Sequence, residues 1–196
     1  MAAYEQEQVE HDASCPCCSG RRQLLSRLAF GTMGLLLPAQ WAVASGRSER
    51  KIRFRNINTG ESMTGIYWTP ETGYIQPSIE QISYFFRDFR EDSVHSVDVN
   101  LLNILSYIQH HVGGRELILR SGYRSPKTNE GLRRSGSKNV AKNSYHMVAK
   151  AADIGVQGYS GKQLATIARG LNAGGVGVGN SFIHVDSGDK DRVWRY

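Results

Sequence analysis

Hydrophobic and polar residues alternate along residues 52–68, on both sides of the turn sequence Asn58-Thr59-Gly60, and this pattern predicts a β-hairpin. The pattern then changes to helical spacing. Apolar residues recur on one helical face over residues 75–91 and again over residues 98–114, which predicts two core helices. We expect Asp98 to cap the second helix and two adjacent glycines to end it.

The second half of the chain contains shorter patterns. The polar segment at residues 127–144 is expected to be a loop or a short helix. We expect a helix over residues 161–175 and strands at residues 116–124, 151–156 and 181–188. The order of these elements predicts one α+β domain over residues 52–196, with a small antiparallel sheet and flanking helices.

The first 44 residues have the pattern of an export signal. Arg21-Arg22 precede an apolar run at residues 29–37, and residues 42–44 have the A-x-A form of a cleavage site. The run is too short for a membrane-spanning helix, which needs about 20 residues. The paired arginines predict a twin-arginine signal and a periplasmic or cell-envelope location, with an ordinary secretory signal or an uncleaved anchor as alternatives. Residues 45–51 are expected to be a disordered lead.

The composition of the exported chain limits the classes of partner that we expect it to bind. All three cysteines (Cys15, Cys17 and Cys18) precede the predicted cleavage site, so the mature domain has neither a disulfide nor a thiol. Removal of residues 1–44, which contain three arginines and four acidic residues, changes the formal charge from +6 to +7. We expect a basic exported protein to meet the carboxylates of the cell wall rather than nucleic acid. We also expect a monomer with no membrane span after signal cleavage.

Two histidine–aspartate pairs occur in or just before the predicted strands. His184 and Asp186 are two residues apart, so their side chains project from the same face of a strand. Asp153 lies in the preceding predicted strand, and His146 lies just before that strand. If the two strands are neighbours, His146, Asp153 and His184 can meet at one point. Two imidazoles and a carboxylate form a ligand set of catalytic zinc, with a position left open for water.

One zinc ion per chain at this point would make hydroxide available at neutral pH, because bound zinc lowers the pKa of its water to about 7. Asp186 is the candidate base that takes the proton from this water, and orienting His184 is its alternative role. The remaining histidines of the mature chain are expected to be structural; they are His95, His110 and His111.

Three segments carry a resemblance to a known family: SGYRSPKTN (121–129), SYHMVAKAAD (144–153) and GGVGVGNSFIHVDSGDKDRVW (174–194). In order and spacing they resemble the signatures of the zinc D-Ala-D-Ala metallopeptidases. The exported murein endopeptidase K-like branch, formerly a domain of unknown function, is similar over nearly all of residues 52–194. The resemblance implies a hedgehog/D-Ala-D-Ala-peptidase-like zinc site and a hydrolase that cuts amide bonds in peptidoglycan stem peptides or crosslinks.

The resemblance also implies roles for single residues. His146, Asp153 and His184 match the zinc ligands of the family. Arg124 matches the basic residue that polarises the scissile carbonyl, which a fixed guanidinium can do strongly. The candidate substrate-binding residues are Ser144, Ser121 and Tyr123.

The chain departs from the family pattern in two respects. Ala149 stands where the pattern has glycine, and a positive φ at that position would strain an alanine. Ser181 and Phe182 occupy the positions where many members carry a histidine or glutamate base, so Asp186 is the remaining acid in reach. A catalytically weak or inactive peptidoglycan-binding module of the same fold is therefore the second interpretation. A structural zinc protein of the envelope is the third.

Charge is uneven between the motifs. Residues 117–152 contain eight basic residues and one acidic residue. Such a segment beside an active site would attract the free carboxylates of stem peptides, whereas a basic surface that only keeps the protein soluble is the alternative. The sequence leaves open whether a D,D or an L,D bond is cut.

Overall fold

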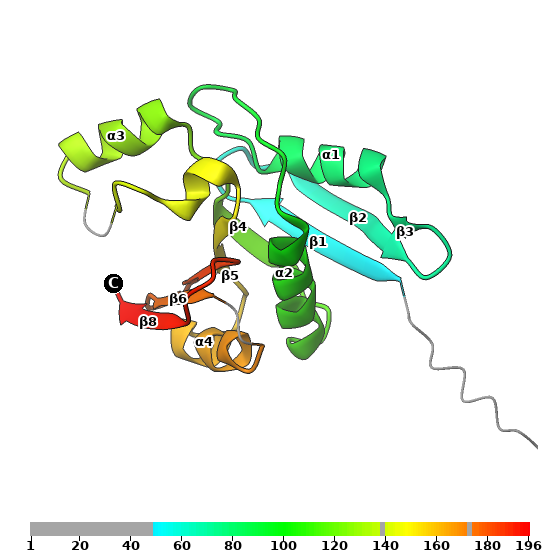
Figure 1. Cartoon of the computed structure of the whole chain (residues 1–196). Helices are drawn as coiled ribbons and strands as arrows, with labels where there is room; N and C mark the ends of the chain where they lie inside the picture. Colours follow the sequence, from blue (N-terminus) through cyan, green and yellow to red (C-terminus); the bar gives the residue numbers. More distant parts are fainter. Residues whose placement is uncertain (1–48, 138–139, 172–173) are drawn as a thin grey trace, which may run out of the picture. The chain divides into compact units, whose positions relative to one another are not determined.

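The computed structural model describes residues 49–196 apart from 138–139 and 172–173, so the predicted signal lies outside the described residues. The strands form one sheet of eight in the order β3-β2-β1-β4-β5-β7-β6-β8 (Figure 1). They are β1 (Arg50–Asn56), β2 (Ser62–Thr69), β3 (Gly73–Tyr74), β4 (Leu117–Ser121), β5 (Ala151–Gly155), β6 (Gly175–Val178), β7 (Ile183–Asp186) and β8 (Arg192–Arg195). The helices are α1 (Gln76–Phe85), α2 (Val99–His111), α3 (Pro126–Arg134), α4 (Gly161–Arg169) and the short 3-10 helix η1 (Tyr145–Val148).

The sheet differs from the small antiparallel sheet that the sequence predicts, because it has eight strands and is mixed. β1 pairs in parallel with β4, and β6 pairs in parallel with β8. The sequence pattern missed β3, β6 and β8. The glycines of β6 obscure the alternation of apolar and polar residues that identifies a strand. β8 is a short edge strand with little buried apolar surface. β1 begins at Arg50, so the last two residues of the predicted disordered lead belong to the sheet.

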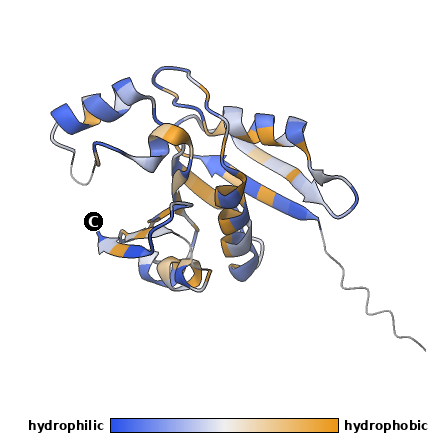
Figure 2. Ribbon diagram, in the orientation of Figure 1, coloured by the Kyte–Doolittle hydropathy of each residue, from blue (hydrophilic) through white to orange (hydrophobic). Residues whose placement is uncertain are grey.

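Helices α1, α2 and α4 pack on one face of the sheet, which we call the inner face. Along β1, Ile52 and Phe54 are fully buried against these helices, whereas Lys51, Arg53 and Arg55 are exposed on the opposite, outer face. Figure 2 shows this alternation as orange bands on a blue strand. The period of two along the strand therefore separates a core face from a solvent face.

The helix boundaries follow local capping chemistry. The Asp98 carboxylate accepts hydrogen bonds from two backbone amides of the first turn of α2, as the sequence predicts. α1 ends at Phe85, earlier than expected, so Phe89 lies in the following loop with 38% of its surface exposed. The polar segment after β4 contains the hydrophilic helix α3 (Figure 2). Within the described residues, no helix is both long and apolar enough to cross a membrane.

Candidate metal centre and its cleft

Two neighbouring strands bring two of the predicted ligands together. β5 and β7 are antiparallel neighbours, and Asp153 and His184 are direct partners in their register. Opposite residues of an antiparallel pair project from the same face, and here that is the outer face, because Ile154 and Ile183 fill the core on the other side. Strand pairing alone therefore places a carboxylate next to an imidazole.

The third predicted ligand, His146, comes from η1, which precedes β5. The Ser144 hydroxyl accepts a hydrogen bond from the His146 amide and so begins this short helix. The His146 ring donates from Nδ1 to the Gly122 carbonyl over 2.7 Å, since a carbonyl oxygen can only accept. This bond fixes the ring and leaves Nε2 as the free nitrogen. Gly122 itself packs closely against Phe86, where a Cβ would lie 2.6 Å from the Phe86 carbonyl oxygen.

The three side chains point their donor atoms at one another. His184 Nδ1 lies 2.9 Å from Asp153 Oδ1 and 3.2 Å from His146 Nε2, and His146 Nε2 lies 3.4 Å from Asp153 Oδ1. All three ligand atoms fall within 4.8 Å of one another. Two imidazole nitrogens and one carboxylate oxygen at this spacing fit a divalent metal with an open coordination position.

Electrostatics favours the protonation states that a metal ligand needs in His146 and Asp153. Burial lowers the pKa of His146 and keeps its ring neutral. Burial of Asp153 opposes its ionisation, but its interactions with His146 and His184 outweigh that effect, so the pKa of Asp153 lies well below its usual value. The hydrogen bonds from His184 to Asp153 and Asp186 likewise outweigh burial and raise the pKa of His184. A proton on His184 Nδ1 lies toward Asp153, on the side of the ring where a metal ion would bind.

Asp186 lies on the far side of His184 from the other ligands. Its Oδ2 is 3.3 Å from His184 Nε2, whereas the ligand atom of this ring is Nδ1. The side chain is 0% exposed, and it also accepts hydrogen bonds from the Gly175 and Gly188 amides and from the Arg192 guanidinium. These partners together outweigh its desolvation and hold the pKa of Asp186 far below its usual value. Asp186 is therefore an anchored partner of His184.

Arg124 borders the metal centre with unused hydrogen-bonding capacity. One of its terminal nitrogens lies 3.7 Å from Asp153 Oδ2, and its side chain is only 12% exposed. Its Nε is buried and has no hydrogen-bond partner among the described residues. Burial lowers the pKa of Arg124, and the nearby Asp153 opposes this shift. A buried guanidinium with an unsatisfied donor is suited to bind a carbonyl or carboxylate of a ligand.

A cleft of about 500 Å³ opens over this centre, and it contains residues that sequence reasoning missed. Besides Arg124, Ser144, His146 and His184, its lining includes Arg133, Asn143, Tyr145, Arg192, Trp194 and Tyr196. β8 supplies the aromatic wall: Trp194 lies opposite Gly177, where a Cβ would come 2.7 Å from the indole. Burial raises the pKa of Tyr196 to about 12, so its phenol stays protonated. The alternating glycines of β6 were the only sequence signal for this wall.

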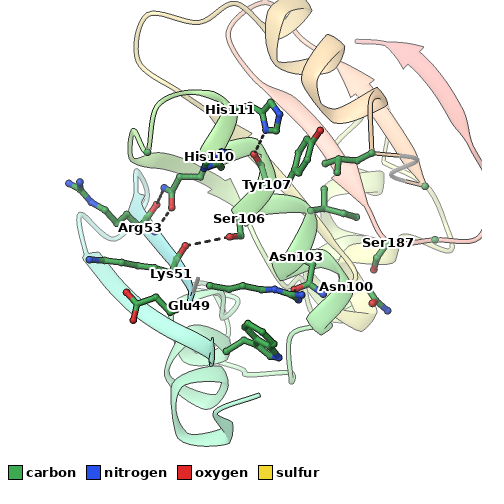
Figure 3. A pocket seen from close by; sticks show the side chains of 18 residues that line it. Glu49, Lys51, Arg53, Asn100, Asn103, Ser106, Tyr107, His110, His111 and Ser187 are labelled. Atoms are coloured by element: carbon green, nitrogen blue, oxygen red, sulfur yellow. Dashed lines mark hydrogen bonds between the residues drawn. The ribbon is translucent and has the colours of Figure 1, made fainter. Parts of the chain in front are cut away.

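The other candidate residues lie elsewhere. Ser121 pairs with Asp153 across β4 and β5, and Tyr123 packs near His95 with ring centroids 5.3 Å apart; neither lines the described cleft. His110 and His111 lie at the end of α2, beside a separate pocket of about 1500 Å³ (Figure 3). Among the described residues, the metal-binding group contains none of these three histidines.

Charges in the basic segment are partly compensated. Arg133 and Arg134 both pair with Glu130, and Lys127 pairs with Glu91. Lys150 lies 3.9 Å from Asp98. Of the basic residues that the structure describes in this segment, Arg124 and Arg133 line the cleft.

Comparison with known proteins agrees with the geometry. Residues 44–194 match the protein family described as peptidoglycan L,D-endopeptidase MepK. The chain is 36% identical over 181 residues to the peptidoglycan L,D-endopeptidase MepK of Escherichia coli (strain K12), covering 90% of this chain and 97% of that protein. It is 37% identical over 175 residues to the probable peptidoglycan L,D-endopeptidase MepK of Haemophilus influenzae, covering 87% and 92%.

Proposed function

The chain belongs to the peptidoglycan L,D-endopeptidase MepK family, and from this premise we propose that it is an exported zinc metallopeptidase that hydrolyses L,D amide bonds in peptidoglycan crosslinks. The observation that carries this proposal is the convergence of His146, Asp153 and His184 beneath a cleft that also contains Arg124. The alternating strand faces, the fixed tautomer of His146 and the open side of the ligand set all support it.

His146 Nε2, His184 Nδ1 and Asp153 Oδ1 would hold the zinc ion. Zinc bound there supplies Lewis-acid polarisation and a hydrolytic hydroxide at neutral pH. Arg124 would bind the scissile carbonyl oxygen and stabilise the negative charge that develops on it, because its buried side chain has spare donors. Trp194 of β8 and the following Tyr196 would exclude water from one side of the peptide and position it.

Asp186 has two candidate roles, and its surroundings favour orientation of His184. A general base must reach the proton that it removes. Asp186 is fully buried, binds the ring nitrogen opposite the ligand atom and is saturated by three further donors. We therefore propose that Asp186 fixes the orientation of the His184 ring and does not take the proton from the attacking water.

Replacing Asp186 with alanine should weaken zinc binding about 10–100-fold, as loss of a partner behind a ligand typically does. Turnover at saturating zinc should remain within about tenfold of wild type. Zinc affinity is measured by competition with a chromophoric chelator, and turnover by muropeptide release. Unchanged zinc affinity together with lost turnover would instead identify Asp186 as the base.

Ala149 bears on the alternative of an inactive binding module. It has φ 50° and ψ 31°, the left-handed conformation that glycine adopts easily, so the strain inferred from the sequence is present. Its amide and carbonyl both make hydrogen bonds, with His146 and Asp98, and the ligands nevertheless converge. The substitution therefore costs conformational energy without displacing His146.

Ala149→Gly should change the free energy of unfolding by less than about 1 kcal/mol, because relief of strain is offset by loss of a buried methyl group worth about 0.8 kcal/mol. Turnover should stay within about twofold of wild type. Chemical denaturation and muropeptide release measure the two quantities. A gain in turnover of tenfold or more would show that the natural chain is impaired and would favour the binding-module interpretation.

The proposed reaction is tested by incubating the protein with purified peptidoglycan sacculi and analysing the released muropeptides by mass spectrometry. Cleavage of L,D crosslinks supports the proposal. Products of D,D cleavage would contradict the bond assignment, and sedimentation with sacculi without any product would contradict the enzymatic assignment. Export by the paired arginines stays a prediction, tested by locating the chain and its Arg21→Lys/Arg22→Lys variant in cell fractions.

A further inference from the structure

A row of cations lies on the outer face of the sheet, outside the cleft. Lys51, Arg53 and Arg55 project from β1 at every second residue and are all exposed. Successive side chains on one face of a strand are about 7 Å apart, so the three charges form a regular line. Arg120 of β4, also exposed, extends the row, which we call the basic strip (Lys51, Arg53, Arg55 and Arg120).

The basic strip shares a face with the metal centre. β1 pairs with β4 through Arg55 and Ile118, β4 pairs with β5, and β5 pairs with β7 at Asp153 and His184. The Arg120 guanidinium lies 4.8 Å from the ring centroid of Phe182, two residues before His184. A polymer that crosses the cleft can therefore continue over the strip without passing around an edge of the sheet.

The charge of the strip is almost uncompensated. β1, β2 and β4 contain no acidic residue. Arg55 lies 3.5 Å from Glu116, whereas Lys51, Arg53 and Arg120 make no ion pair with any residue that the structure describes. This contrasts with α3, whose arginines both pair with Glu130. Aligned unpaired cations create a local field that attracts a polyanion.

Two residues of the strip, Lys51 and Arg53, also border the large pocket beside α2. Figure 3 shows the side chains of Lys51 and Arg53 pointing away from α2, although their backbones bond to Ser106 and Gln109 of that helix. These backbone contacts hold β1 in place. The two side chains can therefore be replaced without loss of a described hydrogen bond.

We propose that the basic strip docks uncut peptidoglycan by binding carboxylates of stem peptides next to the crosslink in the cleft. This inference rests on the proposed function and extends it to a second contact with the same polymer. The regular spacing suits a partner with repeated carboxylates. None of the four strip residues lines the cleft, so a small soluble crosslinked muropeptide can occupy the cleft without them.

The test compares Lys51→Gln/Arg53→Gln with the matched control Lys162→Gln/Arg169→Gln, which removes two exposed cations from α4. Sedimentation with purified sacculi at low salt measures docking, and cleavage of a soluble crosslinked muropeptide dimer measures the reaction. The strip variant should bind sacculi about tenfold more weakly than wild type, whereas the control should bind like wild type. Both should cleave the dimer at the wild-type rate.

Several results would overturn the proposal. Equal losses in the two variants would show an effect of net charge alone, and unchanged sedimentation of the strip variant would remove the docking site. Weaker binding to phosphatidylglycerol vesicles with unchanged binding to sacculi would assign the strip to a membrane surface. Slow dimer cleavage by the strip variant would place these residues in the reaction. Failure of the wild type to cleave the dimer would contradict the proposed function, whatever the sedimentation shows.

Discussion

Replacing His184 with alanine is expected to abolish peptidoglycan hydrolysis and to weaken zinc binding by more than about 100-fold, because loss of a partner behind a ligand already costs 10–100-fold. His184 supplies one of three ligand atoms, and its Nδ1 has the shortest contact in the group, 2.9 Å from Asp153 Oδ1. The variant also leaves Asp153 and Asp186 without a shared cationic partner. Muropeptide release and zinc content per chain measure the effect.

His111→Ala is the matched control for this experiment. His111 is exposed at the end of α2, where it bonds to the Tyr107 carbonyl, and it lies outside the metal-binding group. The control should keep both zinc and activity. Full activity of His184→Ala would contradict the assignment of the metal ligands, and lost activity with normal zinc content would assign His184 to the reaction instead of the metal.

Replacing Arg124 with glutamine should reduce kcat about 10²–10³-fold, the range found when a donor to a developing oxyanion is removed. The side chain lies beside Asp153 and lines the cleft, so substrate in the cleft can reach it. Zinc content should not change, because Arg124 is not a ligand. Steady-state kinetics on a soluble crosslinked dimer separate kcat from KM.

Arg124→Lys keeps the charge and loses the fork of donors, so it should recover only part of the activity. Arg169→Gln on α4 removes an exposed cation away from the cleft and should behave like the wild type. A rise in KM with unchanged kcat in Arg124→Gln would show that Arg124 binds the ground state and transition state equally. That result would contradict its role in stabilising the developing charge.

Part of the ligand placement followed from the sequence, because strand periodicity fixes the face from which Asp153 and His184 each project. His184 and Asp186 project from one face, and small apolar residues around Asp153 predict a strand that passes close to a neighbour. The strand pattern does not fix which strands pair. The parallel pairing of β8 with β6, which brings Trp194 and Tyr196 to the cleft, depends on contacts between distant segments.

The role of Asp186 could not be predicted from spacing. Asp186 is two residues after His184, so both side chains project from the same face of the strand. This spacing is equally consistent with a general base and with a residue that orients His184. The choice between these two roles depends on the burial of Asp186 and on its hydrogen bonds from Gly175, Gly188 and Arg192. These residues come together only in the folded chain. The mixed sheet was also not predicted from the sequence, because the alternating glycines of β6 remove the hydrophobic pattern that identifies a strand.

The most direct test of a catalytic metal at His146, Asp153 and His184 is a zinc titration of the chelator-treated protein, followed by muropeptide release from sacculi. The rate should be at background without metal, should rise in proportion to bound zinc and should reach its maximum at one zinc per chain. Activity that survives complete metal removal, or a fully zinc-loaded chain that releases no muropeptide, would contradict this account.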